Sequence, residues 1–243
     1  MVKIIITRPE LDAAETARRV TELGHEAVIA PLMTVHITPG PPLDLAGVQA
    51  LLLTSANGAR ALAGRMGRRI PDLSVLCVGD ATARAAQAAG LANVESAGGD
   101  VDDLARLAAA RLRPEEGDLL HVAGTKVAGD LAGVLGADGF GYRREVLYEA
   151  RAAENLPEAA HGAIIRCGAG DAACAVMLYS PRTAALFREL AGAAGLGDAL
   201  GRATALCLSA NVAARAGRPW GAVRVAPEPT EDSLFDTLTD LMI

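Results

Sequence analysis

The residues best suited to chemistry follow the ends of predicted strands. At six places an apolar run ends in a small or hydroxylated residue, and a helical pattern begins directly behind it. These turns are Thr7-Arg8-Pro9, Thr54-Ser55, Gly79-Asp80, Gly124-Thr125, Ser180-Pro181 and Ser209-Ala210. Backbone N–H groups at helix starts carry a partial positive charge and bind anions. Any one turn also suits an ordinary structural connection, but together they predict a binding surface for a ligand with several carboxylates.

The hydrophobic pattern predicts parallel sheets that would position these turns. Short apolar runs such as 3–7 and 50–54 alternate with helical stretches such as 10–23, in which apolar residues recur about three positions apart. This alternation of strand and helix is typical of parallel sheets covered by helices. Ligands of such sheets bind at the carboxyl ends of the strands, where the six turns are expected.

An internal repeat indicates that the sheet is built twice. Three segments are echoed later in the chain, in the same order and at a similar offset. Segment 52–56 is echoed by 177–181, segment 76–79 by 206–209, and segment 98–100 by 227–230. We therefore predict two α/β domains of flavodoxin-like construction.

Two proline-containing stretches predict where the chain passes between these domains. They lie at 38–42 and 150–157 and are typical of connectors. The first domain is expected to be discontinuous, with residues 1–35 and 156–243, and the second to contain residues 42–149. Segments 36–41 and 150–155 would then link the two.

Composition narrows the function further. Half of the residues are hydrophobic but only 3% are aromatic, which fits parallel sheets under Ala-rich helices. The net charge of −6 argues against a nucleic-acid partner. We expect no membrane span and no export signal, and hence a soluble, cytoplasmic protein.

The cysteines and histidines predict no metal site. Cys77, Cys167, Cys174 and Cys207 show no paired spacing, and the four histidines are scattered. Cys77 and Cys207 lie within apolar runs and are expected to be small hydrophobic residues of the core. His36 is expected in a connector, and Gly168 at the end of a helix.

Several short segments together resemble the uroporphyrinogen-III synthases. They are Leu-Thr-Ser-Ala-Asn-Gly at 53–58, Val-Gly-Asp-Ala-Thr-Ala at 78–83, Ser-Ala-Gly-Gly-Asp at 96–100, Tyr-Ser-Pro-Arg-Thr at 179–183, Pro-Thr-Glu-Asp-Ser-Leu at 229–234 and the opening Thr7-Arg8-Pro9. Their order and spacing match over nearly the whole length of the chain. The resemblance implies two domains joined by a two-stranded linker, with the active site in the cleft between them.

The resemblance also implies the reaction. The substrate would be hydroxymethylbilane, a linear tetrapyrrole with many carboxylates. It would be cyclised to uroporphyrinogen III with inversion of the terminal pyrrole, ring D, through a spiro intermediate. No metal or organic cofactor is implied. We further expect a monomer that makes at most transient contact with the preceding enzyme of the pathway.

Site residues follow from the matched motifs. The characteristic tyrosine of the family corresponds to Tyr148, which we expect to donate a hydrogen bond to the departing hydroxyl. Asn57 stands where some members carry a basic residue, and the region of Val212 lacks a threonine that some members have. The predicted substrate-binding residues are Arg8, Thr54, Ser55, Asn57, Gly79, Thr82, Gly124, Lys126, Ser180, Pro181, Arg182 and Ser209. Substitution of Ser55 or Ser180 is expected to be mild, because the backbone N–H survives.

Two other functions fit the same sequence. A non-catalytic, two-lobed module that binds or senses small anions would explain two α/β lobes equally well, although the shortage of aromatic residues suits it less. A family member whose activity has decayed would explain the departures near Asn57 and Val212.

Overall fold

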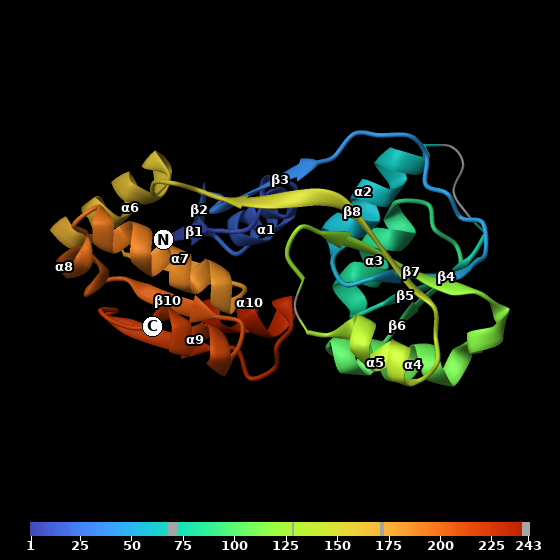
Figure 1. The fold of residues 1–243 in the computed structure, drawn as a ribbon. Helices are drawn as coiled ribbons and strands as arrows, with labels where there is room; N and C mark the ends of the chain where they lie inside the picture. The colour runs from blue at the N-terminus through green and yellow to red at the C-terminus, as the bar shows by residue number, and fades with distance from the viewer. Residues whose placement is uncertain (68–71, 128, 171–172, 240–243) are drawn as a thin grey trace. The chain divides into compact units, whose positions relative to one another are not determined.

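The chain forms two compact units. The computed structural model describes residues 1–67, 72–127, 129–170 and 173–239. Unit 1 contains Met1–Thr34 and Arg151–Ile243, and unit 2 contains Val35–Ala150 (Figure 1). The chain therefore starts in unit 1, forms the whole of unit 2, and returns to unit 1.

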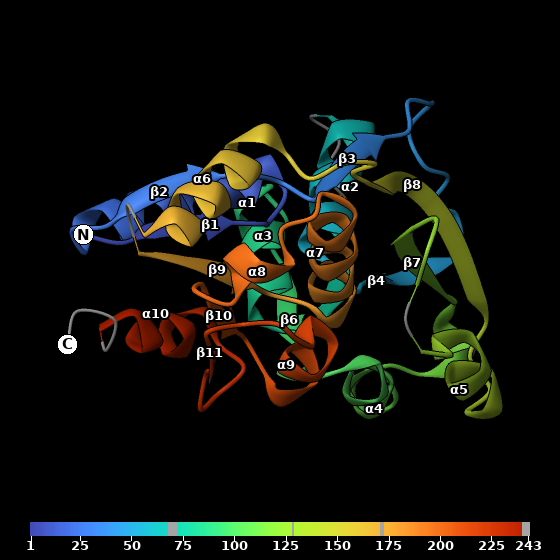
Figure 2. The ribbon, with the colours of Figure 1, turned by 90° about the vertical axis from the view of Figure 1, so that its left-hand side faces the viewer.

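Unit 1 is built on a five-stranded parallel sheet with the order β11-β10-β9-β1-β2. Its strands are β1 (Lys3–Ile6), β2 (Glu26–Ile29), β9 (Cys174–Leu178), β10 (Thr204–Cys207) and β11 (Ala222–Val225). Its helices are α1 (Glu10–Glu22), α6 (Glu158–Ala169), α7 (Pro181–Ala193), α8 (Gly197–Leu200), α9 (Ala210–Ala216) and α10 (Glu231–Thr239), and they can be followed in Figure 2. Helices α6 to α9 pack on one face of the sheet, and α1 and α10 pack on the other.

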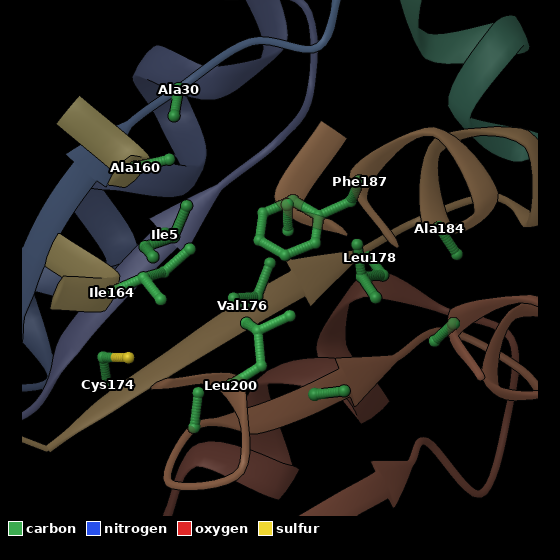
Figure 3. Packing of buried hydrophobic residues seen from close by; sticks show 14 of the residues in the cluster. Ile5, Ala30, Ala160, Ile164, Cys174, Val176, Leu178, Ala184, Phe187 and Leu200 are labelled. Atoms are coloured by element: carbon green, nitrogen blue, oxygen red, sulfur yellow. The ribbon is translucent and has the colours of Figure 1, made fainter. Parts of the chain in front are cut away.

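The larger core cluster of unit 1 surrounds one aromatic ring. Phe187 is fully buried and stacks on Trp220 with ring centroids 5.6 Å apart. Figure 3 shows the Phe187 ring beside Val176 and Leu178 of β9. Most other members of the cluster are aliphatic, as the low aromatic content of the sequence requires.

Unit 2 contains a six-stranded sheet with the order β3-β8-β7-β4-β5-β6. Its strands are β3 (Met33–Ile37), β4 (Val48–Leu53), β5 (Ser74–Cys77), β6 (Val94–Ser96), β7 (Asp118–Gly124) and β8 (Tyr142–Ala152). Its helices are α2 (Ala56–Met66), α3 (Asp80–Ala88), α4 (Val101–Arg111), α5 (Leu131–Ala137) and a 3-10 turn, η1 (Pro114–Glu116). Strands β4 to β8 pair in parallel, α2 and α3 cover one face, and α4 and α5 cover the other.

The two sheets have the same spatial arrangement of parallel strands, but the chain forms these strands in a different order in each unit. Placing β9, β10 and β11 on β4, β5 and β6 also places β1 on β7 and β2 on β8. With its strands numbered in chain order and read from β2, unit 1 has the flavodoxin order 2-1-3-4-5. The parallel strands of unit 2, numbered in the same way and read from β6, have the order 3-2-1-4-5. The sequence echoes fall on β4 and β9, on β5 and β10, and before α4 and α10. The predicted fold class is confirmed.

The chain crosses between the units within strands β3 and β8, which are neighbours in the sheet of unit 2. Strand β3 ends at Ile37 and β8 continues to Ala152, so both enter the segments predicted as linkers. His36 therefore lies in a strand and not in a connector, and it is exposed.

Two predicted helix boundaries are wrong. No helix begins at Gly124-Thr125: α5 begins at Leu131, because Asp130 caps it by accepting a hydrogen bond from the Gly133 N–H at 3.0 Å. Helix α6 continues past Gly168 to Ala169 and ends at Gly170, whose left-handed conformation (φ 85°) suits a glycine.

The predictions for the cysteines of the core are confirmed. Cys77 and Cys207 are free and fully buried, and burial raises the pKa of each thiol to about 11. Within the described ranges, no helix combines the length and apolar character that crossing a membrane requires.

Candidate functional site

The carboxyl edge of the unit 2 sheet contains a topological switch point between β4 and β7. These strands are adjacent and parallel, but α2 follows β4 on one face and α5 follows β7 on the other. Ser55 follows the end of β4, and Gly124 ends β7. Doubly wound sheets bind their ligands in the crevice that such a divergence opens.

Tyr148 reaches this switch point from β8. Its side chain is 8% exposed, and its hydroxyl lies 2.7 Å from Ser55 Oγ. The pairing of β7 with β8 shifts register between Ala123 and Gly124, so that Gly124 lies opposite Tyr148. The irregularity places Leu147 and Tyr148 in the same buried cluster, under α2 and α3. A bulge in the strand thus directs the phenol toward Ser55.

Gly124 provides the space for the Tyr148 ring. A Cβ at position 124 would lie 2.7 Å from both Cε2 and Cζ of Tyr148, and 3.1 Å from its hydroxyl oxygen. These distances are too short for nonbonded carbon atoms, so the ring needs a residue without a side chain beneath it. Gly124 was predicted as a substrate-binding residue, and its observed contact is with the tyrosine.

Ser55 holds the start of α2 as well as Tyr148. Its Oγ accepts a hydrogen bond from the Gly58 N–H at 3.1 Å and is the N-cap of the helix. Because a hydroxyl accepts and donates at once, the cap leaves Ser55 able to hydrogen-bond Tyr148. The cap fixes Ser55 Oγ, and Ser55 Oγ fixes the tyrosine hydroxyl.

A second buried group lies directly behind this turn, and the sequence did not predict it. His121 of β7 is 2% exposed, with its Nε2 2.9 Å from Thr54 Oγ1 and its Nδ1 2.6 Å from the Tyr142 hydroxyl. Burial, assisted by the positive charge of Arg144, lowers the pKa of His121 to about 4. The only sequence signal was an imidazole within an apolar strand, which more often indicates a satisfied core residue.

The remaining predicted residues of unit 2 have varied surroundings. Gly79 is the N-cap of α3, and Thr82 in the first turn of that helix is 5% exposed. Asn57 accepts a hydrogen bond from Arg60 at 3.0 Å. Lys126 is exposed.

The equivalent edge of unit 1 is occupied by an ion pair. Arg8, after β1, lies 2.5 Å from Glu231 and 4.4 Å above the ring of Tyr179. Burial would lower the pKa of Arg8, but the negative charge of Glu231 raises it overall. Burial also raises the pKa of Tyr179, and Glu231 raises it further. Arg8 therefore already has a carboxylate partner within the chain.

The other predicted residues of unit 1 lie at the starts of helices. Ser180 caps α7 by accepting a hydrogen bond from the Thr183 N–H at 3.1 Å, and Pro181 is the first residue of that helix. Ser209 caps α9 through the Val212 N–H at 3.4 Å. Arg182 is exposed. Ser180 Oγ has Thr183 Oγ1 beside it at 2.8 Å, where Ser55 has Tyr148.

Comparison with known proteins decides the family. The sequence model of the family described as Uroporphyrinogen-III synthase HemD matches residues 14–236. The chain belongs to this family. The resemblance inferred from the sequence is thereby confirmed, and with it uroporphyrinogen-III synthase activity, a lyase reaction of haem biosynthesis.

Solved synthase structures share the fold. Uroporphyrinogen-III synthetase from Helicobacter pylori 26695 aligns with a TM-score of 0.66 and 15% identity, over 99% of this chain and 100% of that one. A mutant synthase from the extremely thermophilic bacterium Thermus thermophilus aligns with a TM-score of 0.53 and 17% identity, over 100% of this chain and 99% of that one. No curated protein matches the chain significantly.

Within this synthase fold, the structure brings together Tyr148, Ser55 and Gly124 from the predicted set. A surface hollow of about 320 Å³ between α1 and α10 contains none of the predicted residues. Among the described residues, no group of three or more His, Cys, Asp or Glu side chains is placed to hold a metal ion.

Gly124→Ala should displace the Tyr148 ring. Because the family resemblance implies that Tyr148 acts on the substrate, we expect uroporphyrinogen III to form about tenfold to a hundredfold more slowly, since small misplacements of a reacting group can cost about 10²-fold. The control is Gly64→Ala within α2, where an added Cβ meets no atom within 4 Å, and it should stay within about twofold of wild type. A folded Gly124→Ala protein with the wild-type rate would contradict the need for this ring position.

His121 should make the protein less stable as the pH falls from about 6.5 to about 4. The folded chain keeps the imidazole neutral down to about pH 4, whereas the unfolded chain protonates it near pH 6.5. Unfolding therefore takes up a proton in this window, and roughly 3 kcal/mol of stability is lost across it.

Denaturant unfolding between about pH 7 and pH 4 measures this effect. His121→Gln should lose correspondingly less stability than wild type across the window. Parallel curves for wild type and His121→Gln would show that His121 does not titrate as its burial requires.

Proposed function

We propose that Tyr148 assists the loss of the hydroxyl group from hydroxymethylbilane at the switch point of unit 2. One observation carries this proposal: the Tyr148 hydroxyl lies 2.7 Å from Ser55 Oγ, where β4 and β7 diverge. Tyrosine O–H is a suitable donor to a departing hydroxyl, and help of this kind is typically worth about 10²–10⁴-fold in rate.

The reaction then needs little other acid–base chemistry. The hydroxymethyl oxygen leaves as water with one added proton, and an electron-poor azafulvenium cation remains. The terminal pyrrole attacks through its substituted carbon and forms a spiro intermediate. This intermediate fragments and recloses with ring D reversed, and the pyrrole carbon loses a proton that balances the one taken up.

Ser55 supports Tyr148 in this scheme. If the Ser55 hydroxyl donates to the Tyr148 oxygen, the Tyr148 proton is free to point at the substrate. The same bond stabilises negative charge on the phenol oxygen as its proton is shared with the leaving group. The expectation that Ser55→Ala is mild was based on the backbone N–H alone. The contact with Tyr148 adds a role for the Ser55 side chain, which is to hold the tyrosine hydroxyl. For Ser180 that expectation stays a prediction.

We also propose that helix starts at the carboxyl edges of the sheets hold the substrate carboxylates. The backbone N–H groups at the starts of α2 and α3, with Lys126 after the end of β7, suit this role in a chain of net charge −6. Arg182, Ser180, Pro181 and Ser209 have the same proposed role in unit 1. Cytoplasmic location, a monomeric state and transient contact with the preceding enzyme stay predictions.

The isomer composition of the product tests this proposal. Wild-type protein given freshly generated hydroxymethylbilane should form mainly the type III isomer, whereas the unaided substrate closes without inversion to type I. Tyr148→Phe should slow type III formation by about 10²-fold or more, because it removes only the hydroxyl. Its share of type I product should rise as the uncatalysed closure competes.

Two results would count against the proposal in different ways. Type I product alone from wild type, at the rate without protein, would contradict synthase activity and favour the anion-binding module. Type III product from Tyr148→Phe at the wild-type rate would keep the activity but remove Tyr148 from the mechanism.

A further inference from the structure

The three side chains behind the Ser55 turn form one continuous line of hydrogen bonds. Tyr142 at the start of β8 bonds His121 Nδ1 at 2.6 Å, and His121 Nε2 bonds Thr54 Oγ1 at 2.9 Å. The imidazole is 2% exposed, whereas Thr54 at the end of β4 is only half-buried. The line thus runs from half-buried Tyr142, through the buried imidazole, to the turn that carries Ser55.

The two distances give the line a direction. A neutral imidazole has one N–H donor and one acceptor nitrogen, so one hydroxyl must donate to it and the other must accept from it. A separation of 2.6 Å suits an O–H donor and is short for an N–H donor, whereas 2.9 Å is typical of N–H to oxygen. These distances favour the tautomer in which Tyr142 donates to Nδ1 and Nε2–H donates to Thr54.

This direction leaves the Thr54 proton uncommitted. In this tautomer Thr54 Oγ1 accepts from His121, and within the described part of the chain the Thr54 hydroxyl shows no other hydrogen bond. The proton can then point away from His121, at the turn beside Ser55 and the switch point. Connected donors also polarise one another, which strengthens the last donor of the line.

We propose that His121 and Tyr142 are positioning residues that hold the Thr54 hydroxyl as a hydrogen-bond donor to a carboxylate of the substrate. This inference rests on the proposed function, because it needs the substrate at the edge that Tyr148 marks. A neutral donor line suits an acidic chain that must bind a polycarboxylate without a cation at every contact. The low pKa of His121 keeps the line neutral at ordinary pH.

Thr54→Val tests the contact with the substrate, since valine keeps the shape and removes the hydroxyl. The variant should raise the KM for hydroxymethylbilane about tenfold, with kcat and the type III share close to wild type. Thr237→Val in α10 is the matched control, because it removes a buried hydroxyl bonded to the Leu234 carbonyl of unit 1. The control should keep the wild-type KM.

Tyr142→Phe tests whether Tyr142 acts through Thr54. It should raise the KM in the wild-type background and have no further effect in a Thr54→Val background. A merely structural role for Tyr142 would give equal factors in both backgrounds and would overturn the proposal. An unchanged KM in Thr54→Val, with wild type still making type III product, would also overturn the proposal. If wild type itself made no type III product, the proposed function would be contradicted instead.

Nitrogen NMR of the wild-type protein tests the direction of the line without any turnover. The His121 signal, identified by its loss in His121→Gln, should show a protonated Nε2 and an unprotonated Nδ1 near pH 7. In the opposite tautomer the Thr54 hydroxyl would donate its proton in a hydrogen bond to Nε2, and none would be left for the substrate. That result would overturn the proposal, whatever the variants do.

Discussion

The hydrogen bond between Tyr148 and Ser55 depends on three separate features of unit 2. The irregular pairing of β7 with β8 turns Tyr148 onto the face under α2. Gly124 leaves room for the ring, and the N-cap of α2 fixes Ser55 Oγ. Each feature restricts a different degree of freedom of the phenol, so a single hydroxyl is held where the sheet diverges. Such restriction is what a reaction decided by geometry requires.

The two units show how one arrangement of strands can carry different chemistry. Ser55 and Ser180 cap equivalent helices at equal distances of 3.1 Å, yet only Ser55 meets a tyrosine. In unit 1, β2 takes the place of β8 and ends at Ile29, which has no hydroxyl to offer. Arg8 and Glu231 instead neutralise each other at that edge. The asymmetry explains why we assign the reacting group to unit 2.

The fold could be predicted from the sequence because its signals are local. Apolar runs, glycine stops and serine caps mark the elements one at a time, and the internal echoes show that the pattern occurs twice. The role of Tyr148 was predicted from the resemblance to a family. The contact of Tyr148 with Ser55 was not predicted, because Ser55 lies 93 residues away and the contact depends on the order of strands in the sheet.

The errors have the same origin. The helix expected after Gly124-Thr125 begins at Leu131, because the Gly124 and Thr125 carbonyls accept hydrogen bonds from Arg144 of a neighbouring strand and Asp130 is the better cap. The line from Tyr142 through His121 to Thr54 joins β8 and β7 to the turn after β4. Nothing in the spacing of these residues along the chain indicates that they meet.

The proposed mechanism requires the Ser55 side chain to act on the reaction through Tyr148, and this requirement can be measured in one comparison of variants. The rate of type III product formation would be measured for Ser55→Ala and Ser180→Ala, each in wild-type and Tyr148→Phe backgrounds. Both substitutions remove an N-cap worth about 1 kcal/mol of stability, so the cap alone cannot distinguish them. We predict a clear loss of rate for Ser55→Ala only where Tyr148 is present, and small, equal effects for Ser180→Ala in both backgrounds. Equal losses for the two serines, or the same loss for Ser55→Ala without the Tyr148 hydroxyl, would show that Ser55 does not act through Tyr148.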